Sequence, residues 1–271
     1  MIETPEIVIE RIAVARGGGG SLSSLAGRAA AAVKDDGLGG VIAATFSNPD
    51  RFPALAVEVA AAIGLPAATP AFDLQMACSA YPYAVYLAGR LAADTGRRIL
   101  VIDGDVQTPL VDQADHATGA IFSDAVTATV VSASVADGAR SRFDFLSRHD
   151  TALTCSAAGP IRMDGFKVFS FVATEVSAFL KGFGDDADWF VPHQAQPYMV
   201  RQLARSLGFD DRLLTIPESE RNPGSCSVAM ALAANAEKAR GSRVLIAGFG
   251  AGLSAAAGLV KVGEEFKDLE I

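Results

Sequence analysis

The chain has 271 residues, half of them hydrophobic, and a formal net charge of −8 at pH 7. That length and composition suffice for a large buried core and are typical of a soluble α/β enzyme of one or two domains, which excludes a disordered or fibrous chain. No cluster of Lys and Arg stands out, so the sequence argues against a nucleic-acid partner.

The sequence also sets expectations about location and metals. The start Met1-Ile-Glu-Thr-Pro has no basic residues followed by an apolar run, so no signal peptide is expected, and no apolar stretch of about 18 residues predicts a membrane span. Cys78, Cys155 and Cys226 lack CxxC spacing, so neither disulfides nor a metal site is expected. We therefore predict a cytoplasmic protein with reduced thiols.

The first half of the chain alternates strand-like and helix-like segments. The four glycines at 17–20 predict a loop, because ordering them inside a regular element costs too much entropy. The predicted strands are residues 7–15, 41–46, 71–74, 98–103 and 125–135, and the predicted helices are 21–33, 53–63 and 83–93. This alternation favours a central sheet with helices on its faces.

The second half repeats the rhythm of the first. The predicted strands are residues 188–191, 214–216, 244–248 and 259–260, and the predicted helices are 166–183, 196–207 and 225–239. The order of elements, rather than residue identity, indicates an internal duplication into halves 1–140 and 141–271.

Cys78 is the candidate nucleophile. It follows a strand-like segment and is expected to open a helix, whose N-terminal partial positive charge favours the thiolate. The thiolate is the nucleophilic form of cysteine. From local context alone, the alternative is a structural buried cysteine.

Two further polar residues and a glycine turn are candidates. His193 stands at the C-terminal end of a predicted strand, where α/β sheets place functional groups, although a plain loop histidine is the alternative. Asn222 is either a turn or cap residue or an amide that donates to an oxyanion. The turn Gly248-Phe-Gly-Ala-Gly252 lacks GxGxxG spacing and a P-loop lysine, so close backbone approach to a reacting centre is favoured over phosphate binding.

In combination, four segments closely resemble the beta-ketoacyl-ACP synthase III family: AFDLQMACSA, DWFVPHQAQ, ERNPGSCSVAMAL and LIAGFGAGLSAAAGLV. The resemblance extends from about Ser21 to the C-terminus. It implies an α/β thiolase-like fold, in which two duplicated α/β halves form a layered α-β-α-β-α core, and a Cys-His-Asn triad. It also implies an acyltransferase that uses acyl-CoA or acyl-carrier-protein thioesters as substrates and needs no cofactor.

The resemblance assigns roles to individual positions. Cys78 would be the acylated nucleophile, while His193 and Asn222 would activate a malonyl thioester for decarboxylation and stabilise the enolate. The backbone oxyanion hole is assigned to Cys78 and Ala251, and the substrate pocket to Phe52, Phe249 and Gly250. In the family, the loop with Phe52 reaches across a dimer.

The sequence departs from the family at several places. The first strand–helix unit, with the residues that hold the CoA nucleotide, has no counterpart in this sequence. His116 and Tyr198 stand where the family tends to have arginine, Pro223 where threonine is common, and Ala251 where glycine is normal.

These departures leave three hypotheses open: a decarboxylative condensing enzyme, a non-condensing acyltransferase of a secondary-metabolite pathway, and a partner subunit of a heterodimer with a full-length homologue. The intact triad favours an enzyme. A homodimer is expected because the thiolase fold normally extends its sheet across a two-fold interface.

Overall fold

A sheet of nine strands runs through the residues that the computed structural model describes, which are 1–115, 118–134, 138–156, 159–217 and 219–271. The strand order is β3-β2-β4-β5-β1-β6-β11-β10-β9, and β7 and β8 form a separate pair. The strands are β1 Ile2–Arg16, β2 Leu38–Ala44, β3 Ala71–Leu74, β4 Arg98–Asp105, β5 Ala125–Ser134, β6 Arg140–Ser147, β7 Leu153–Thr154, β8 Arg162–Met163, β9 Trp189–Pro192, β10 Arg243–Gly250 and β11 Ser254–Glu270. The α-helices are α1 Leu22–Val33, α2 Leu55–Ala62, α3 Ala80–Thr95, α4 Gly165–Phe171, α5 Ser177–Leu180, α6 Pro197–Ser206, α7 Ser227–Ala234 and α8 Ala236–Ala239.

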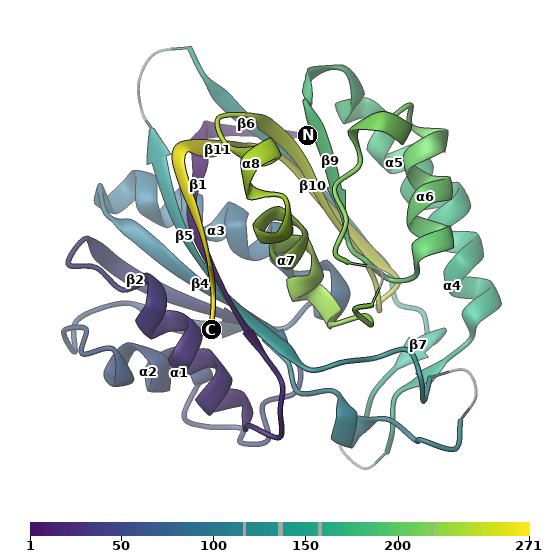
Figure 1. Ribbon diagram of the computed structural model, residues 1–271, viewed down its shortest axis with the longest axis horizontal. Helices are drawn as coiled ribbons and strands as arrows, with labels where there is room; N and C mark the ends of the chain where they lie inside the picture. Colours follow the sequence, from purple (N-terminus) through teal and green to yellow (C-terminus); the bar gives the residue numbers. More distant parts are fainter. Residues whose placement is uncertain (116–117, 135–137, 157–158, 218) are drawn as a thin grey trace.

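Three hydrophobic clusters define the layers of the molecule. In one, α1 and α2 cover the outer face of the strands from the first half, and in another, α4 to α6 cover the outer face of β9, β10 and β11. The largest cluster contains α3 and α7, which pack against the inner faces of strands from both halves. Figure 1 shows the two outer helix groups at opposite ends of the molecule, with α7 between them. This arrangement is the α-β-α-β-α core that the family resemblance predicts.

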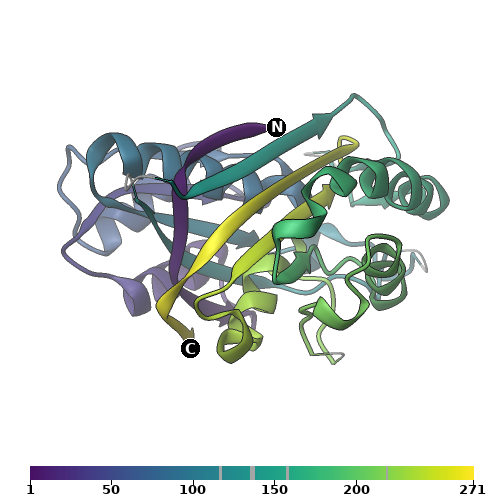
Figure 2. The same cartoon turned by 90° about the horizontal axis from the view of Figure 1, so that it is seen from above.

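The first strand joins the two halves of the sheet. β1 pairs with β5 from its own half and with β6 and β11 from the other half. Its pairing with β11 is parallel and matches Val8 with Lys261. Figure 2 shows β1 and β11 side by side in the middle of the molecule.

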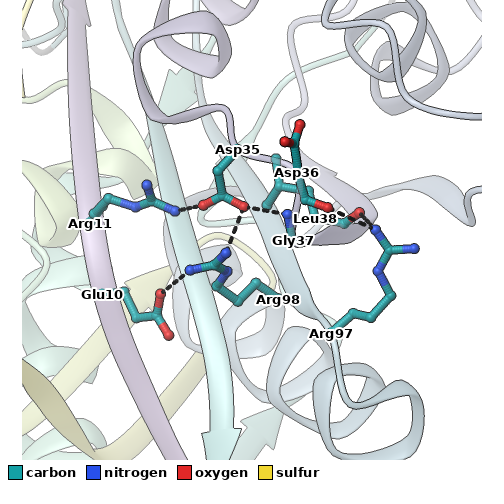
Figure 3. A network of polar contacts seen from close by, with 8 residues as sticks. All are labelled: Glu10, Arg11, Asp35, Asp36, Gly37, Leu38, Arg97 and Arg98. Carbon is teal, nitrogen blue, oxygen red and sulfur yellow. Dashed lines mark hydrogen bonds and ion pairs between the residues drawn. The ribbon is translucent and has the colours of Figure 1, made fainter.

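A network of ion pairs ties β1 to the loop before β2 (Figure 3). Asp35 accepts hydrogen bonds from the guanidinium groups of Arg11 and Arg98 and from the backbone N–H of Gly37. Arg98 also lies 3.5 Å from a carboxylate oxygen of Glu10. The side chains of Arg11 and Asp35 are about one-fifth exposed, so these charges stay in contact with water.

Helix α2 lacks a capping side chain of its own. Asp73, on β3, supplies the cap instead, because its carboxylate oxygens accept from the backbone N–H groups of Leu55 at 2.8 Å and Ala56 at 2.9 Å. Asp73, which lies on β3 just before the turn that contains Cys78, therefore fixes the first turn of α2.

Most of the predicted elements are present, and the differences have local causes. The strand predicted at 214–216 is wrong: Leu213 makes a single bridge to Phe190, and the chain then leaves the sheet. The helix predicted at 166–183 contains a π turn at Val172–Val176, and the one predicted at 225–239 is interrupted at Asn235. β6 was not predicted. His116 and Val135, the end of the predicted strand 125–135, lie outside the described residues.

Candidate active site

Cys78 lies at a tight turn between β3 and α3. It is in the 3₁₀ turn Ala77–Ser79, directly before the first residue of α3, and its side chain is buried. The turn forces Ala77 to a φ of 43°, in the left-handed region. A non-glycine residue there costs on the order of 1 kcal/mol, and such strained residues cluster at active sites.

The glycine turn at the end of β10 packs directly on this cysteine. A Cβ atom on Gly250 would lie 2.8 Å from the Cβ and 3.1 Å from the Sγ of Cys78, and one on Gly248 would lie 2.8 Å from the Cys78 carbonyl oxygen. Both positions therefore require glycine. The predicted close approach of backbone to the candidate nucleophile is present.

The thiol of Cys78 is held in its neutral form. Burial raises its pKa to about 12, and the charges of Asp105 and Asp103 act in the same direction, while hydrogen bonds from the backbone of Ala251 and of Cys78 itself oppose them. The expectation that a helix start favours the thiolate is therefore wrong here. Desolvation, the largest cause, together with the nearby acidic residues outweighs the backbone N–H groups, so the thiol must lose its proton during any reaction.

His193 follows β9 and is held by the backbone and by Ser227. Its backbone N–H donates to the carbonyl of Ala247 at 2.7 Å, and the ring nitrogen Nδ1 lies 2.8 Å from the Ser227 hydroxyl oxygen. That oxygen also accepts the backbone N–H of Gln194 at 3.0 Å, and its own hydrogen is free to be donated to Nδ1; in that tautomer, Nε2 carries the proton. Burial lowers the pKa of His193 to about 4, opposed by a hydrogen bond to the backbone of Gly224.

Asn222 is fixed on both its backbone and its side chain. Its N–H donates to Ile121 at 2.9 Å, its carbonyl accepts from the N–H of Ser123 at 3.0 Å, and its Oδ1 accepts from the N–H of Gly224 at 2.9 Å. Within the described residues its amide nitrogen has no hydrogen-bond partner, so this group is available as a donor.

Contacts link the three candidate residues. Gly250 lies against Cys78, the neighbouring Phe249 ring meets the His193 ring edge-on with centroids 5.6 Å apart, and the backbone of Gly224 is hydrogen-bonded to both His193 and Asn222. The structure thus joins Cys78 through shared neighbours to His193 and Asn222, which follow it by 115 and 144 positions in the sequence.

Cys78 opens on a cavity of about 1060 Å³. Residues from several loops line it, among them Phe46, Gln107, Leu110, Phe122, Leu153, Cys155 and Ala251. A smaller cavity of about 290 Å³ is lined by Asn222 and Gln194. His193 lines neither cavity.

The three residues predicted for the substrate pocket occupy different places. Phe249 and Gly250 lie behind Cys78 and are not among the lining residues. Phe52 is 83% exposed and is not among the lining residues, although its neighbour Arg51 is.

Two buried aspartates near Cys78 were missed by the sequence analysis. Asp103 and Asp105 are both fully buried at the end of β4. Asp103 accepts from the hydroxyl of Ser225, and Asp105 from the hydroxyl of Thr45. The available signal was two acidic residues at i and i+2 at the end of an apolar strand, which places them on one face. Ser227 gave no comparable signal.

Among the described residues, no group of three or more His, Cys, Asp or Glu side chains could hold a metal ion. Over the same part of the chain, no helix is long and apolar enough to cross a membrane.

Comparison with known families gives two matches on the chain. Residues 72–149 match 3-Oxoacyl-[acyl-carrier-protein (ACP)] synthase III, and residues 183–262 match the C-terminal part of the same enzyme. The first match contains Cys78, and the second contains His193, Asn222 and the glycine turn.

Individual relatives agree with these matches. The chain is 32% identical over 256 residues to a beta-ketoacyl-[acyl-carrier-protein] synthase III from Sphingopyxis alaskensis, covering 86% of this chain and 79% of that protein. It is 29% identical over 265 residues to the enzyme of that name from Shewanella oneidensis, covering 89% and 83%.

Solved structures share the fold. A 3-oxoacyl-(acyl-carrier protein) synthase from Burkholderia xenovorans superimposes with a TM-score of 0.88 at 22% identity, over 100% of this chain and 98% of that one. The priming beta-ketosynthase of the R1128 polyketide pathway superimposes with a TM-score of 0.75 at 27% identity, over 83% and 75%.

The family matches, the relatives and the shared fold together place the chain in the thiolase superfamily, among its acyltransferases. Within that superfamily, the chain belongs to the beta-ketoacyl-ACP synthase III family.

Proposed function

We propose that the protein forms an acyl-enzyme on Cys78 and then condenses that acyl group with a malonyl thioester, with loss of carbon dioxide. The observation that carries the proposal is the position of the thiol. Cys78 opens on the large cavity, is hydrogen-bonded by the backbone of Ala251, and is linked through Gly250 and Phe249 to His193.

In the first step, the sulfur of Cys78 attacks the carbonyl of an acyl-CoA or acyl-carrier-protein thioester. The thiol proton passes to the departing thiolate, so the carrier leaves as a free thiol. The backbone N–H groups of Cys78 and Ala251 would bind the oxyanion of the tetrahedral intermediate. Such donors act best in a water-excluded site, and the buried thiol provides one.

In the second step, a malonyl thioester loses carbon dioxide, and the electrons left behind form an enolate. The amide of Asn222 and Nε2–H of neutral His193 would donate to the enolate oxygen. The enolate carbon attacks the acyl carbonyl on Cys78, the β-ketoacyl thioester leaves, and the thiolate of Cys78 takes up a proton. Because the pKa of His193 is about 4, its imidazole stays neutral at neutral pH, and a neutral N–H donor is what this role needs.

We also propose that the active species is a homodimer. β3 is an edge strand of the sheet, and its Phe72 side chain is 40% exposed. An unpaired strand edge of this kind is a template for pairing with another copy.

The test is intact mass spectrometry after incubation with acyl-CoA donors of different chain length. We expect one acyl adduct on the wild type and none on Cys78→Ala, with Cys155→Ser, which changes another thiol at the same cavity, as the matched control that keeps the adduct. Labelled malonyl thioester should then release carbon dioxide. An adduct without carbon dioxide release would instead indicate a non-condensing acyltransferase, and an adduct that survives Cys78→Ala would place the nucleophile elsewhere.

A further inference from the structure

The buried aspartates at the end of β4 have no countercharge. Asp103 and Asp105 are both 0% exposed, and within the described residues neither forms an ion pair with Lys, Arg or His. The nearby imidazole of His193 supplies no positive charge either, because its pKa is about 4 and it is neutral at pH 7. Two unpaired negative charges close together in a dry interior are mutually destabilising, so one carboxylate must hold a proton.

The hydrogen bonds distinguish the two carboxylates. Oδ1 of Asp105 accepts three donors, which are the Thr45 hydroxyl at 2.7 Å, the N–H of Phe46 at 2.9 Å and the N–H of Ser47 at 3.0 Å. A carboxylate that accepts two or three such bonds is stabilised in its charged form. Burial still raises the pKa of Asp105, but these hydrogen bonds oppose the shift, so Asp105 is the carboxyl of the pair whose charged form is better stabilised.

Asp103 has a different environment. The one hydrogen-bond partner of its carboxyl group in the described part of the chain is the hydroxyl of Ser225, on Oδ1, and Oδ2 meets no donor. The Oδ2 of Asp105 is also without a partner there. Burial, together with the charge of Asp105, raises the pKa of Asp103 well above its ordinary value.

The pair lies directly beneath the candidate active site. A Cβ atom added to Gly224 would lie 3.5 Å from the Oδ2 of Asp105, so this carboxyl group is next to the Gly224 backbone. That backbone is hydrogen-bonded to Asn222 and His193. Ser225, the partner of Asp103, is the next residue of the same turn. The charge on this pair therefore acts on the reacting groups at short range.

We propose that Asp103 holds the proton of the Asp103–Asp105 pair and Asp105 holds the charge, so that Cys78 faces one carboxylate rather than two. The titratable groups coupled to Asp103 are Asp105 on its own strand, Cys226 on the 3₁₀ turn Gly224–Cys226, and Cys78 and Tyr81 around the start of α3. The neighbouring strands β2 and β5 contribute no charged side chain within their bounds. Asp103 thus acts on the nucleophile through its protonation state.

The test measures the reactivity of Cys78 and does not require the proposed condensation. Alkylation of Cys78 by iodoacetamide at pH 7 is followed by peptide mass spectrometry in the wild type, Asp103→Asn and Asp105→Asn, with folding of each checked by circular dichroism. If Asp103 is already neutral, Asp103→Asn leaves the rate within about twofold of wild type, whereas removing the Asp105 charge raises it by about tenfold, equivalent to one pKa unit.

Either of two results would overturn the proposal. One is a rate increase in Asp103→Asn as large as in Asp105→Asn, since that would mean Asp103 is charged. The other is measured by infrared spectroscopy at pH 7: we expect a protonated carboxylic acid C=O band in the wild type that Asp103→Asn removes. A wild type without this band contradicts the proposal even if Asp105→Asn fails to fold.

Discussion

Acidic side chains of this protein lie in two contrasting environments. At Asp35, on the surface side of the sheet, a carboxylate is held by Arg11 and Arg98 and remains about one-fifth exposed. At Asp103 and Asp105, two carboxylates are fully buried and meet hydroxyl and N–H donors in place of cations. The comparison shows that a carboxylate near water is neutralised by a cationic side chain. In the dry interior, a carboxyl group is instead neutralised by a bound proton or stabilised by hydroxyl and backbone N–H donors.

The largest effect expected from this comparison is on the fold itself. Asp105→Ala removes the carboxylate acceptor of the buried Thr45 hydroxyl and of the part-buried N–H groups of Phe46 and Ser47, the last of which keeps only the Thr45 oxygen, and this should cost about 3 kcal/mol. Urea denaturation would measure the loss. Asp105→Asn keeps an acceptor oxygen and should lower the free energy of unfolding clearly less. Equal losses in the two variants would show that the stability does not come from hydrogen bonds to these donors.

The second effect concerns His193, which is buried like the aspartates and, among the described residues, has the neutral Ser227 hydroxyl rather than a carboxylate beside its ring. Because its pKa is about 4, the imidazole is neutral at pH 5 and above, and the pH–rate profile of condensation should lose activity on the acid side near pH 4. An acid limb near pH 6.5 that moves when Ser227 is changed to Ala would contradict this, because it would mean that the imidazole titrates as in water.

The third effect is on the pH dependence of stability. The pKa of Asp103 is raised in the folded protein, so its contribution to stability is present at low pH and is lost as pH rises from the ordinary aspartate value towards the folded-state value. Asp103→Asn removes this titration. The free energy of unfolding of this variant, relative to that of wild type, should therefore rise with pH by up to about 1.4 kcal/mol per pH unit within that window. Urea unfolding at pH 5, 6 and 7 would measure this difference. A difference that does not change with pH would contradict the assignment.

The smallest effect belongs to the exposed network. Asp35→Asn should lower the free energy of unfolding by about 1 kcal/mol or less, and 1 M salt should remove most of that difference. Asp36→Asn is the matched control, since Asp36 is exposed and only its carbonyl accepts a hydrogen bond from Arg97. A salt-independent loss of several kcal/mol at Asp35 would place it with the buried pair.

The sequence predicted the elements whose pattern is local. Strands such as 71–74 and helices such as 21–33 were recovered because each is a continuous run between clear breakers. The layered core came from the family resemblance rather than from periodicity. Residues 214–216 failed because a short apolar run does not reveal whether a neighbouring strand has room to pair with it.

The site was only partly accessible from the sequence. The turn positions of Cys78, His193 and Asn222 follow from local signals, but the charge state of the thiol does not, because it depends on Asp103 and Asp105 across the fold. Ser227 was missed for the same reason, since its hydroxyl reaches a histidine 34 positions away. Desolvation and tertiary hydrogen bonds leave no trace in sequence spacing.

The position of β1 has a consequence for the order of folding. Its parallel pairing with β11 matches Val8 with Lys261, whereas its antiparallel pairing with β5 matches the same residue with Ser132. Because pairings between segments far apart in the sequence close slowly, we expect the β1–β11 ladder to form after the β1–β5 ladder. The strand that joins the two halves of the sheet is therefore completed late in folding.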